Sequence, residues 1–97
     1  RYRLATRAAI GQTEAMRFVM YTTKYCGYCE RARRLLRSRG IAFEDIDVTR
    51  DPDTRRRVMN ETGHLTVPVI LLDGKLLGGS DELVELEESG GLDTFAA

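Results

Sequence analysis

Residues 18–29 read Phe-Val-Met-Tyr-Thr-Thr-Lys-Tyr-Cys-Gly-Tyr-Cys, and they hold both a strand signal and a reactive pair. The run from Phe18 to Tyr21 is short, β-prone and free of polar interruptions, which is typical of a buried central strand. A helix is predicted after the second cysteine, because apolar residues recur at helical spacing up to Gly40. Cys26 and Cys29 are therefore expected where a strand passes into a helix.

The next elements continue the alternation of strand and helix. A strand is predicted over 41–48, where apolar and acidic residues alternate before two β-branched residues. Asp51 is expected to cap a second helix with Pro52 as its first residue. Gly63 is expected to end that helix in the left-handed conformation.

The last part of the chain predicts a hairpin and a further helix. A strand over 67–72 is followed by Asp73-Gly74, the strongest short hairpin signal, and then by an antiparallel strand over 75–77. Ser80 is expected to be the N-cap of the last helix. The order strand-helix-strand-helix-strand-strand-helix predicts an α/β fold with one four-stranded mixed sheet flanked by helices.

Length and composition limit the chain to one domain. It has 97 residues, of which 42% are hydrophobic and 31% charged. No stretch approaches the roughly 20 apolar residues of a membrane-spanning helix, so a soluble domain is expected. The folded domain is predicted over 17–97. Residues 1–16 are interpreted as a disordered extension or an engineered or processed end, and their basic, acid-poor composition is shared with transit peptides.

The charges cancel over the whole chain but not along it. Fifteen basic and fifteen acidic residues leave no electrostatic reason to bind nucleic acid or an anionic membrane. Residues 1–39 carry ten basic and two acidic groups, whereas residues 40–97 carry five and thirteen. The arginine-rich face of the first helix is interpreted as a solvated face that also makes the surroundings of Cys26 electropositive and favours acidic partners.

The two cysteines are the residues that predict chemistry. A sulfur at position 26 would face the free N–H groups and the positive end of the helix dipole, which stabilise its thiolate form. Lys24 and Arg31 add positive charge nearby. Cys29 falls on the same side one turn later, where it can attack a mixed disulfide formed on Cys26.

Two plainer interpretations of the cysteine pair stay open. The pair could be half of a zinc site, but structural zinc needs four ligands and the chain offers only His64 in addition. It could also be two inert core cysteines, although the intervening glycine and the helix start favour exposure. His64 is interpreted as a loop or surface histidine and receives no role.

Three separate motifs occur along the chain: Tyr21-Thr22-Thr23-Lys24-Tyr25-Cys26-Gly27-Tyr28-Cys29, Thr66-Val67-Pro68 and Gly78-Gly79-Ser80-Asp81-Glu82-Leu83. In their order and spacing, these motifs resemble the glutaredoxin family over about residues 17–95. The resemblance implies a thioredoxin-like fold and a dithiol protein that works with glutathione.

The resemblance also implies a glutathione site. Pro68 would be cis, whereas the base rate for X-Pro bonds favours trans, and the Val67 backbone would pair with the cysteine part of glutathione. The first amides of the last helix would bind the γ-glutamyl carboxylate, and Asp81 would accept from the amino group. The implied glutathione-binding residues are Lys24, Tyr28, Arg55, Thr66, Val67, Pro68, Gly79, Ser80 and Asp81.

Some of these residues have narrower expected roles. Lys24 and Arg55 are candidates for the glycine carboxylate, and Tyr28 would flank the thiol groove. The family commonly has its lysine three residues before the first cysteine, where this chain has Thr23. It also more often has proline at the position of Gly27. In the family such substitutions accompany members that bind a [2Fe–2S] cluster between two subunits.

The leading prediction is a cytoplasmic, monomeric glutathione-disulfide oxidoreductase. Cys26 would attack protein disulfides and glutathionyl mixed disulfides, and Cys29 would resolve the mixed disulfide formed on Cys26. The alternative is a dimeric [2Fe–2S] carrier or sensor in which Cys26 and glutathione supply the thiolates. A thioredoxin-type reductase fed by a flavoprotein is a third interpretation, which the motif at 78–81 disfavours.

Overall fold

The computed structural model describes residues 16–96. Its strands are β1 (Phe18–Thr22), β2 (Phe43–Asp47), β3 (Val69–Leu72) and β4 (Lys75–Gly78). Its helices are α2 (Gly27–Ser38), α3 (Pro52–Thr62) and α4 (Ser80–Glu88). The predicted element order is confirmed, and the extension predicted over 1–16 lies outside the described residues apart from Met16.

The four strands form one sheet in the order β2-β1-β3-β4. β1 pairs in parallel with β2 and antiparallel with β3, and β3 pairs antiparallel with β4. β1 is therefore central, and all five of its residues are buried. This agrees with its uninterrupted apolar sequence, because a strand covered on both faces needs no polar side chains.

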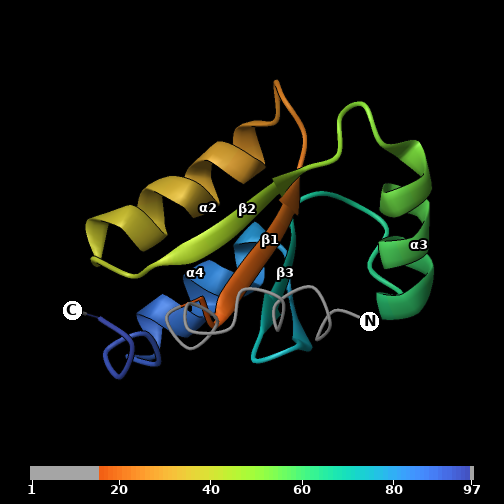
Figure 1. Ribbon diagram of the computed structural model, residues 1–97. Helices are drawn as coiled ribbons and strands as arrows, with labels where there is room; N and C mark the ends of the chain where they lie inside the picture. Colours follow the sequence, from red (N-terminus) through yellow and green to blue (C-terminus); the bar gives the residue numbers. More distant parts are fainter. Residues whose placement is uncertain (1–15, 97) are drawn as a thin grey trace.

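The helices cover both faces of the sheet, as Figure 1 shows. Phe18 and Met20 of β1 point into a core that contains buried residues of α2 and α4. Val19 and Tyr21 alternate onto the other face and join a second core with Val58 of α3. The period of two along β1 thus divides the hydrophobic core into two layers.

The helix ends and the hairpin turn follow the predicted residues. Asp51 caps α3 by accepting from the Thr54 amide at 3.2 Å, and Gly63 ends that helix with φ 77°. Asp73 and Gly74 both have positive φ, 53° and 82°, which is the type I′ geometry of a two-residue hairpin. The predicted cap and end of α3 and the predicted hairpin turn are therefore confirmed.

Two predicted strand starts are wrong by two residues, for different reasons. Strand β2 begins at Phe43 because the Ile41 amide donates to the Leu36 carbonyl oxygen at 3.0 Å and belongs to the end of α2. Strand β3 begins at Val69 rather than at Val67, since Pro68 has no N–H to give to the sheet.

The start of α4 also differs from the prediction. The N-cap is Gly79, and Ser80 is the first residue of the helix. The Gly79 amide donates to the Glu82 side chain at 2.7 Å, so a residue inside the helix supplies the cap. Ser80 therefore has no capping role.

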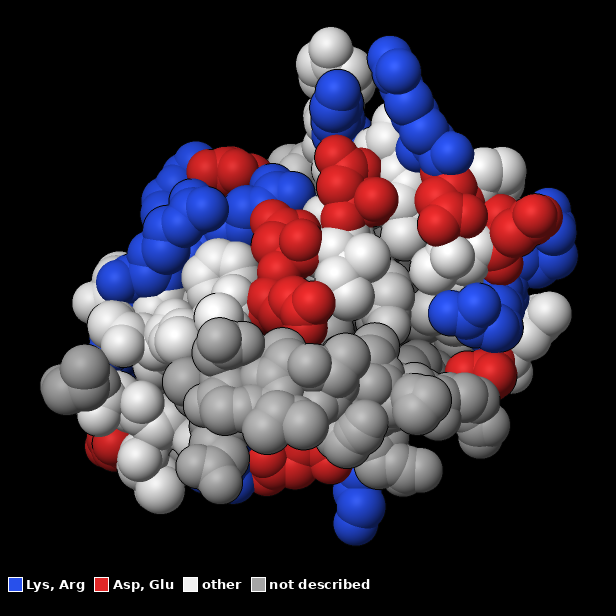
Figure 2. Space-filling view, viewed as in Figure 1, with Lys and Arg blue, Asp and Glu red and all other residues white. Residues whose placement is uncertain are grey.

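The charge asymmetry of the sequence becomes a set of ion pairs around α2. Arg33 pairs with Asp45 of β2 at 2.5 Å, and Arg31 pairs with Asp81 of α4 at 3.3 Å. Arg39, just after α2, pairs with Glu87 at 2.6 Å. Figure 2 shows basic side chains gathered over α2 with acidic ones beside them. Within residues 16–96, no helix is long and apolar enough to cross a membrane.

Candidate functional site

Cys26 is the N-cap of α2, at the junction predicted from the sequence. Its sulfur accepts a hydrogen bond from the Cys29 amide at 3.1 Å, in place of the oxygen that a serine or aspartate cap would supply. The side chain is only partly buried. Cys26 Sγ is thus held at the positive end of a helix and remains open to a reactant.

Cys29 has the opposite environment in the first turn of the same helix. It is fully buried, and this burial is the main cause that raises the pKa of its thiol to about 12, with a hydrogen bond to the Cys26 side chain as the second cause. The negative charge of a Cys26 thiolate contributes further to the raised pKa. Cys29 is therefore a protonated thiol at neutral pH until Cys26 changes its state.

The segment before β3 approaches the reactive sulfur from a second side. The Val67-Pro68 bond is cis, as the resemblance implied and contrary to the base rate for X-Pro bonds. The Cys26 thiol donates to the Val67 carbonyl oxygen at 3.9 Å. Main-chain groups of residue 67 are thus beside Cys26, where an extended ligand can pair with them.

The first turn of α4 contributes hydrogen-bond donors whose availability differs. The Gly79 amide is occupied by Glu82, and this bond is the main cause that holds the pKa of Glu82 below its usual value. The amides of Ser80 and Asp81 are the first two of the helix and have no acceptor within it. The Ser80 and Asp81 amides are therefore open to an anion, whereas the Gly79 amide is already occupied.

Ser80 itself has an unexpected environment. The residue is buried, and its Oγ is the one buried side-chain oxygen or nitrogen without a hydrogen-bond partner in the described part of the chain. The side chain thus adds a polar atom to the first turn of α4 without stabilising the turn.

His64 lies in this region although the sequence interpretation gave it no role. Its Nε2 is 3.4 Å from Thr66 Oγ1, and a Cβ added at Gly79 would be 3.1 Å from the same nitrogen. The histidine therefore links the segment before Pro68 to the start of α4. Its position two residues before Thr66 was the available signal, but only the fold shows that the ring packs against Gly79.

Lys24 and Arg55 are less closely tied to the sulfur. The Lys24 amide donates to Thr49 Oγ1 at 2.8 Å, after the end of β2. The Lys24 ammonium adds to the hydrogen bonds with Thr49 that lower the pKa of Asp47. Arg55 is exposed in α3. Lys24 thus lies in the loop between β1 and α2, and Arg55 lies in the first turn of α3.

Two exposed tyrosines flank Cys26. Tyr28, predicted to line the groove, has 61% of its surface exposed. Tyr25 is fully exposed and has a positive φ of 54°, which the sequence did not indicate. Aromatic surface next to a reactive sulfur gives a reactant apolar contact area.

The structure also bears on the two plainer interpretations of the cysteine pair, as inert core residues or as half of a zinc site. Cys29 behaves as a buried core residue, whereas Cys26 does not. Over the described range 16–96 there is no group of three or more His, Cys, Asp or Glu residues that could hold a metal ion. A zinc site of four ligands cannot be assembled from these residues alone.

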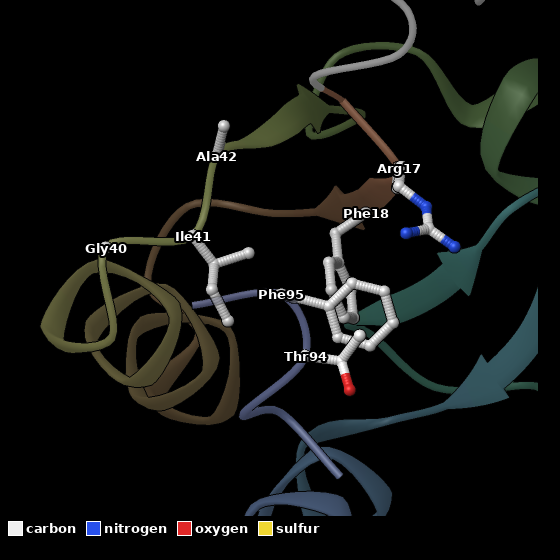
Figure 3. Close-up of a pocket in the computed structure, with 7 residues that line it drawn as sticks. All are labelled: Arg17, Phe18, Gly40, Ile41, Ala42, Thr94 and Phe95. Carbon is white, nitrogen blue, oxygen red and sulfur yellow. The ribbon is translucent and has the colours of Figure 1, made fainter. Parts of the chain in front are cut away.

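A hollow elsewhere on the domain has no reactive group. Figure 3 shows it beside Phe18, the first residue of β1, whereas Cys26 follows the end of that strand. It is lined by Arg17, Phe18, Gly40, Ile41, Ala42, Thr94 and Phe95. The Phe18 and Phe95 rings meet edge to face at 5.2 Å, and the Arg17 guanidinium is 4.7 Å from the Phe95 ring centre. These contacts fix the end of the chain to the core.

Known proteins resemble this chain in both sequence and structure. Glutaredoxin 3 of Escherichia coli strain K12 is 38% identical over 74 residues, which cover 76% of this chain and 89% of that protein. A glutaredoxin of Pseudomonas aeruginosa is 40% identical over 77 residues, which cover 79% and 92%.

Solved structures agree with the fold. The holo form of glutaredoxin C1 from Populus tremula x tremuloides has a TM-score of 0.76 at 27% identity, with 95% of this chain and 94% of that chain covered. A buckwheat glutaredoxin-glutathione complex has a TM-score of 0.77 at 27% identity, with 97% and 88% covered. The thioredoxin-like fold implied by the motifs is confirmed.

The family itself follows from the sequence match. The glutaredoxin family model matches residues 18–77, which run from β1 through Cys26, Cys29 and Pro68 into β4. This range contains the helix-capping sulfur and the segment that approaches it. The chain belongs to the glutaredoxin family.

Proposed function

We propose that this glutaredoxin uses glutathione to reduce protein disulfides and mixed disulfides between proteins and glutathione, with Cys26 as nucleophile. The observation that carries the proposal is the contrast within the pair. Cys26 Sγ caps α2 and is partly exposed, whereas Cys29 is buried with its pKa raised to about 12. Only one of the two sulfurs is ready to attack a substrate.

Removal of glutathione from a protein needs only Cys26. The Cys26 thiolate attacks the glutathionyl sulfur of the mixed disulfide, a bond forms between these two sulfurs, and the protein leaves as a thiolate. A second glutathione thiolate then attacks the bound glutathionyl sulfur. Glutathione disulfide is released and the Cys26 thiolate returns.

Reduction of a protein disulfide uses Cys29 as well. Cys26 attacks one sulfur of the substrate, and the resulting mixed disulfide no longer carries the thiolate charge that raises the pKa of Cys29. Deprotonated Cys29 attacks Cys26 Sγ and releases the substrate thiolate. Two glutathione molecules then reduce the Cys26–Cys29 disulfide.

The glutathione site is proposed on the residues around this sulfur. The Val67 backbone would pair with the cysteine part of glutathione, with Thr66 and Pro68 on either side of it. The open amides of Ser80 and Asp81 would bind the γ-glutamyl carboxylate. The buckwheat glutaredoxin-glutathione complex among the structural neighbours supports glutathione as the ligand.

The remaining contacts of that site are proposed from position and charge. Lys24 and Arg55 are the cations available for the glycine carboxylate, and Tyr28 flanks the groove beside Cys26. Gly79, whose amide is already bonded to Glu82, would contribute close packing and not a donor.

Two variants test the division of labour. We expect Cys26→Ser to abolish turnover of a glutathionyl mixed disulfide, measured as NADPH oxidation through glutathione reductase. We expect Cys29→Ser to keep this activity and to lose most of its activity on a protein disulfide substrate. Loss of both activities in the Cys29 variant would contradict the mechanism.

The cluster alternative remains a second proposal. Cys26 is the half-buried sulfur, and the space around Gly27 is open because an added Cβ would meet no atom within 4 Å. A [2Fe–2S] cluster would take Cys26 and a glutathione thiol from each of two copies. Purification without oxygen and with glutathione should then give a coloured dimer, and a colourless monomer would contradict the alternative.

The cellular setting is proposed from the chemistry alone. A dithiol that must return to its reduced form requires a reducing compartment, so the cytoplasm is the proposed location. The proposed partners are glutathionylated or disulfide-bonded proteins, and the proposed state without a cluster is a monomer.

A further inference from the structure

A network of side chains lies one helical turn beyond the buried Cys29. Arg33 follows Cys29 by four positions in α2, so the two side chains share one side of the helix, with Cβ atoms about 5–6 Å apart. Arg33 Nε donates to Asp45 Oδ2 of β2 at 2.5 Å, and Thr22 Oγ1 of β1 donates to Asp45 Oδ1 at 2.6 Å. The network thus fixes the Arg33 guanidinium between α2 and the sheet.

Arg33 differs in burial from Arg31 and Arg34 of the same helix. Its side chain is 18% exposed, whereas theirs are 44% and 76% exposed. The hydrogen bond to Asp45 is the main cause that raises the pKa of Arg33, so the guanidinium stays charged although it is largely removed from water. A charge in this position acts on a neighbouring group with little screening by salt.

The neighbouring group on which this charge acts is Cys29. Burial is the main cause that raises the pKa of the Cys29 thiol, and the hydrogen bond to Cys26 and the Cys26 charge raise it further. A hydrogen bond with the Thr23 backbone and the positive charge of Arg33 act in the opposite direction. Once Cys26 is part of a mixed disulfide, its negative charge is gone, and Arg33 remains as a fixed cation that favours the Cys29 thiolate.

We propose that Arg33 is a positioning residue that acts through Cys29 in the resolving step, where its fixed cation stabilises the Cys29 thiolate during attack. In this step the Cys29 proton passes to water, a bond forms between the two cysteine sulfurs, and the bond between Cys26 Sγ and the substrate sulfur breaks. The electron pair of the broken bond leaves on the substrate thiolate. The inference rests on the proposed role of Cys29 and gives Arg33 no part in the attack by Cys26.

An aromatic disulfide with a coloured thiolate separates the two attacks. Reduced protein is mixed with excess dithiobis-nitrobenzoate in a stopped-flow instrument. Attack by Cys26 releases one thiolate at a rate proportional to the reagent concentration. Attack by Cys29 on the mixed disulfide releases the second at a rate that does not depend on this concentration, because the step is intramolecular. Both rates are therefore measured on one sample.

Arg33→Gln is expected to slow the second release about threefold and to leave the first unchanged, since the lost thiolate is partly offset by the greater nucleophilicity of a more basic sulfur. Arg33→Lys keeps a positive charge without the planar fork of arginine and is expected to retain most of the second rate. Arg34→Gln is the matched control, because it removes an exposed arginine of the same helix and should change neither rate.

Two further variants separate the charge of Arg33 from the support of the network. Thr22→Val removes the hydrogen bond to Asp45 but keeps the Arg33 cation, so it should change neither rate. Arg33→Gln combined with Asp45→Asn removes the same cation and leaves no unpaired carboxylate. This double variant is expected to slow the second release alone, and it carries the test if the single variant does not fold.

Three results would overturn the inference. The first is an unchanged second rate in folded protein that lacks the Arg33 charge. The second is equal slowing of both releases, or slowing of the second release by Thr22→Val, either of which would indicate a structural role. The third is a second rate in Arg33→Lys as low as in Arg33→Gln. Absence of a second release from the unsubstituted protein would instead contradict the proposed role of Cys29, so the two failures are distinguishable.

Discussion

At the scale of single residues, Cys26 and Cys29 have the same side chain and nearly opposite reactivity. The amide hydrogen bond and partial exposure of Cys26 depend on its position as a helix cap. The high pKa of Cys29, about 12, depends first on burial. The sequence predicted Cys26 at the start of the helix and Cys29 one turn later, but the difference in burial comes from the fold.

Alkylation tests this difference. At pH 7.5, iodoacetamide is expected to label Cys26 and to leave Cys29 unlabelled, because only a thiolate reacts and burial keeps Cys29 protonated. Peptide mass spectrometry measures the label at each site, and the unfolded protein is the control in which both should react. Equal labelling of both sites in the folded protein would contradict the assignment.

Two hydroxyl groups test the polar contacts around the site. Ser80→Ala is expected not to lower the free energy of unfolding, because Ser80 Oγ is buried without a partner. Thr22→Val is the comparison, since Thr22 Oγ1 donates to Asp45 at 2.6 Å. Loss of this hydrogen bond is expected to lower the free energy of unfolding by about 1 kcal/mol. Urea denaturation measures both, and a larger loss for Ser80→Ala would be the opposite result.

His64 shows why residue roles could only partly be predicted. The sequence places it near Thr66 but gives no information on Gly79, which follows 15 positions later. The contact between the ring and Gly79 exists because the segment before Pro68 and the start of α4 come together. Long-range packing of this kind leaves no local pattern.

At the scale of elements, the start of α4 depends on two glycines and one glutamate. Gly78 has φ 137°, and a Cβ there would lie 2.6 Å from Glu82 Cγ. That space allows Glu82 to reach back to the Gly79 amide. The sequence predicted the helix but assigned the cap to Ser80, since glycine has no side chain that could signal a cap supplied from within the helix.

Alanine substitutions test this arrangement. Gly78→Ala is expected to lower the free energy of unfolding by about 1–3 kcal/mol, because both its backbone angle and Glu82 oppose a Cβ. Gly27→Ala is the control, since Gly27 has open space and no positive φ, and it should not destabilise. Equal denaturant midpoints for the two variants would contradict the account.

Acid titration tests the Glu82 cap. Its hydrogen bonds to backbone amides hold the pKa of Glu82 below its usual value near 4.5 in the folded protein. The stabilisation is therefore present above about pH 4.5 and is lost as the pH falls through the lower folded value. Glu82→Gln should keep a cap but lose this part of the acid dependence, measured by denaturation between pH 6 and pH 3. An unchanged acid profile would count against the cap.

At the scale of the whole molecule, the sequence predicted the architecture but not the pairing of its charges. Alternating strands and helices with one hairpin leave few ways to build a single sheet, so the element order was sufficient. Basic residues predominate in the first 39 positions and acidic residues in the rest of the chain. The fold instead brings acidic residues of the second half beside α2, as with Arg33 and Asp45.

The central claim is that Cys26 takes the glutathionyl group and not the protein half of a mixed disulfide. The direct measurement mixes the reduced Cys29→Ser variant with a glutathionylated peptide in the absence of free glutathione and identifies the adduct by mass spectrometry. The account predicts one glutathionyl group on Cys26 and one free peptide thiol released for each adduct. A peptide attached to Cys26, or no adduct on the folded protein, would contradict it.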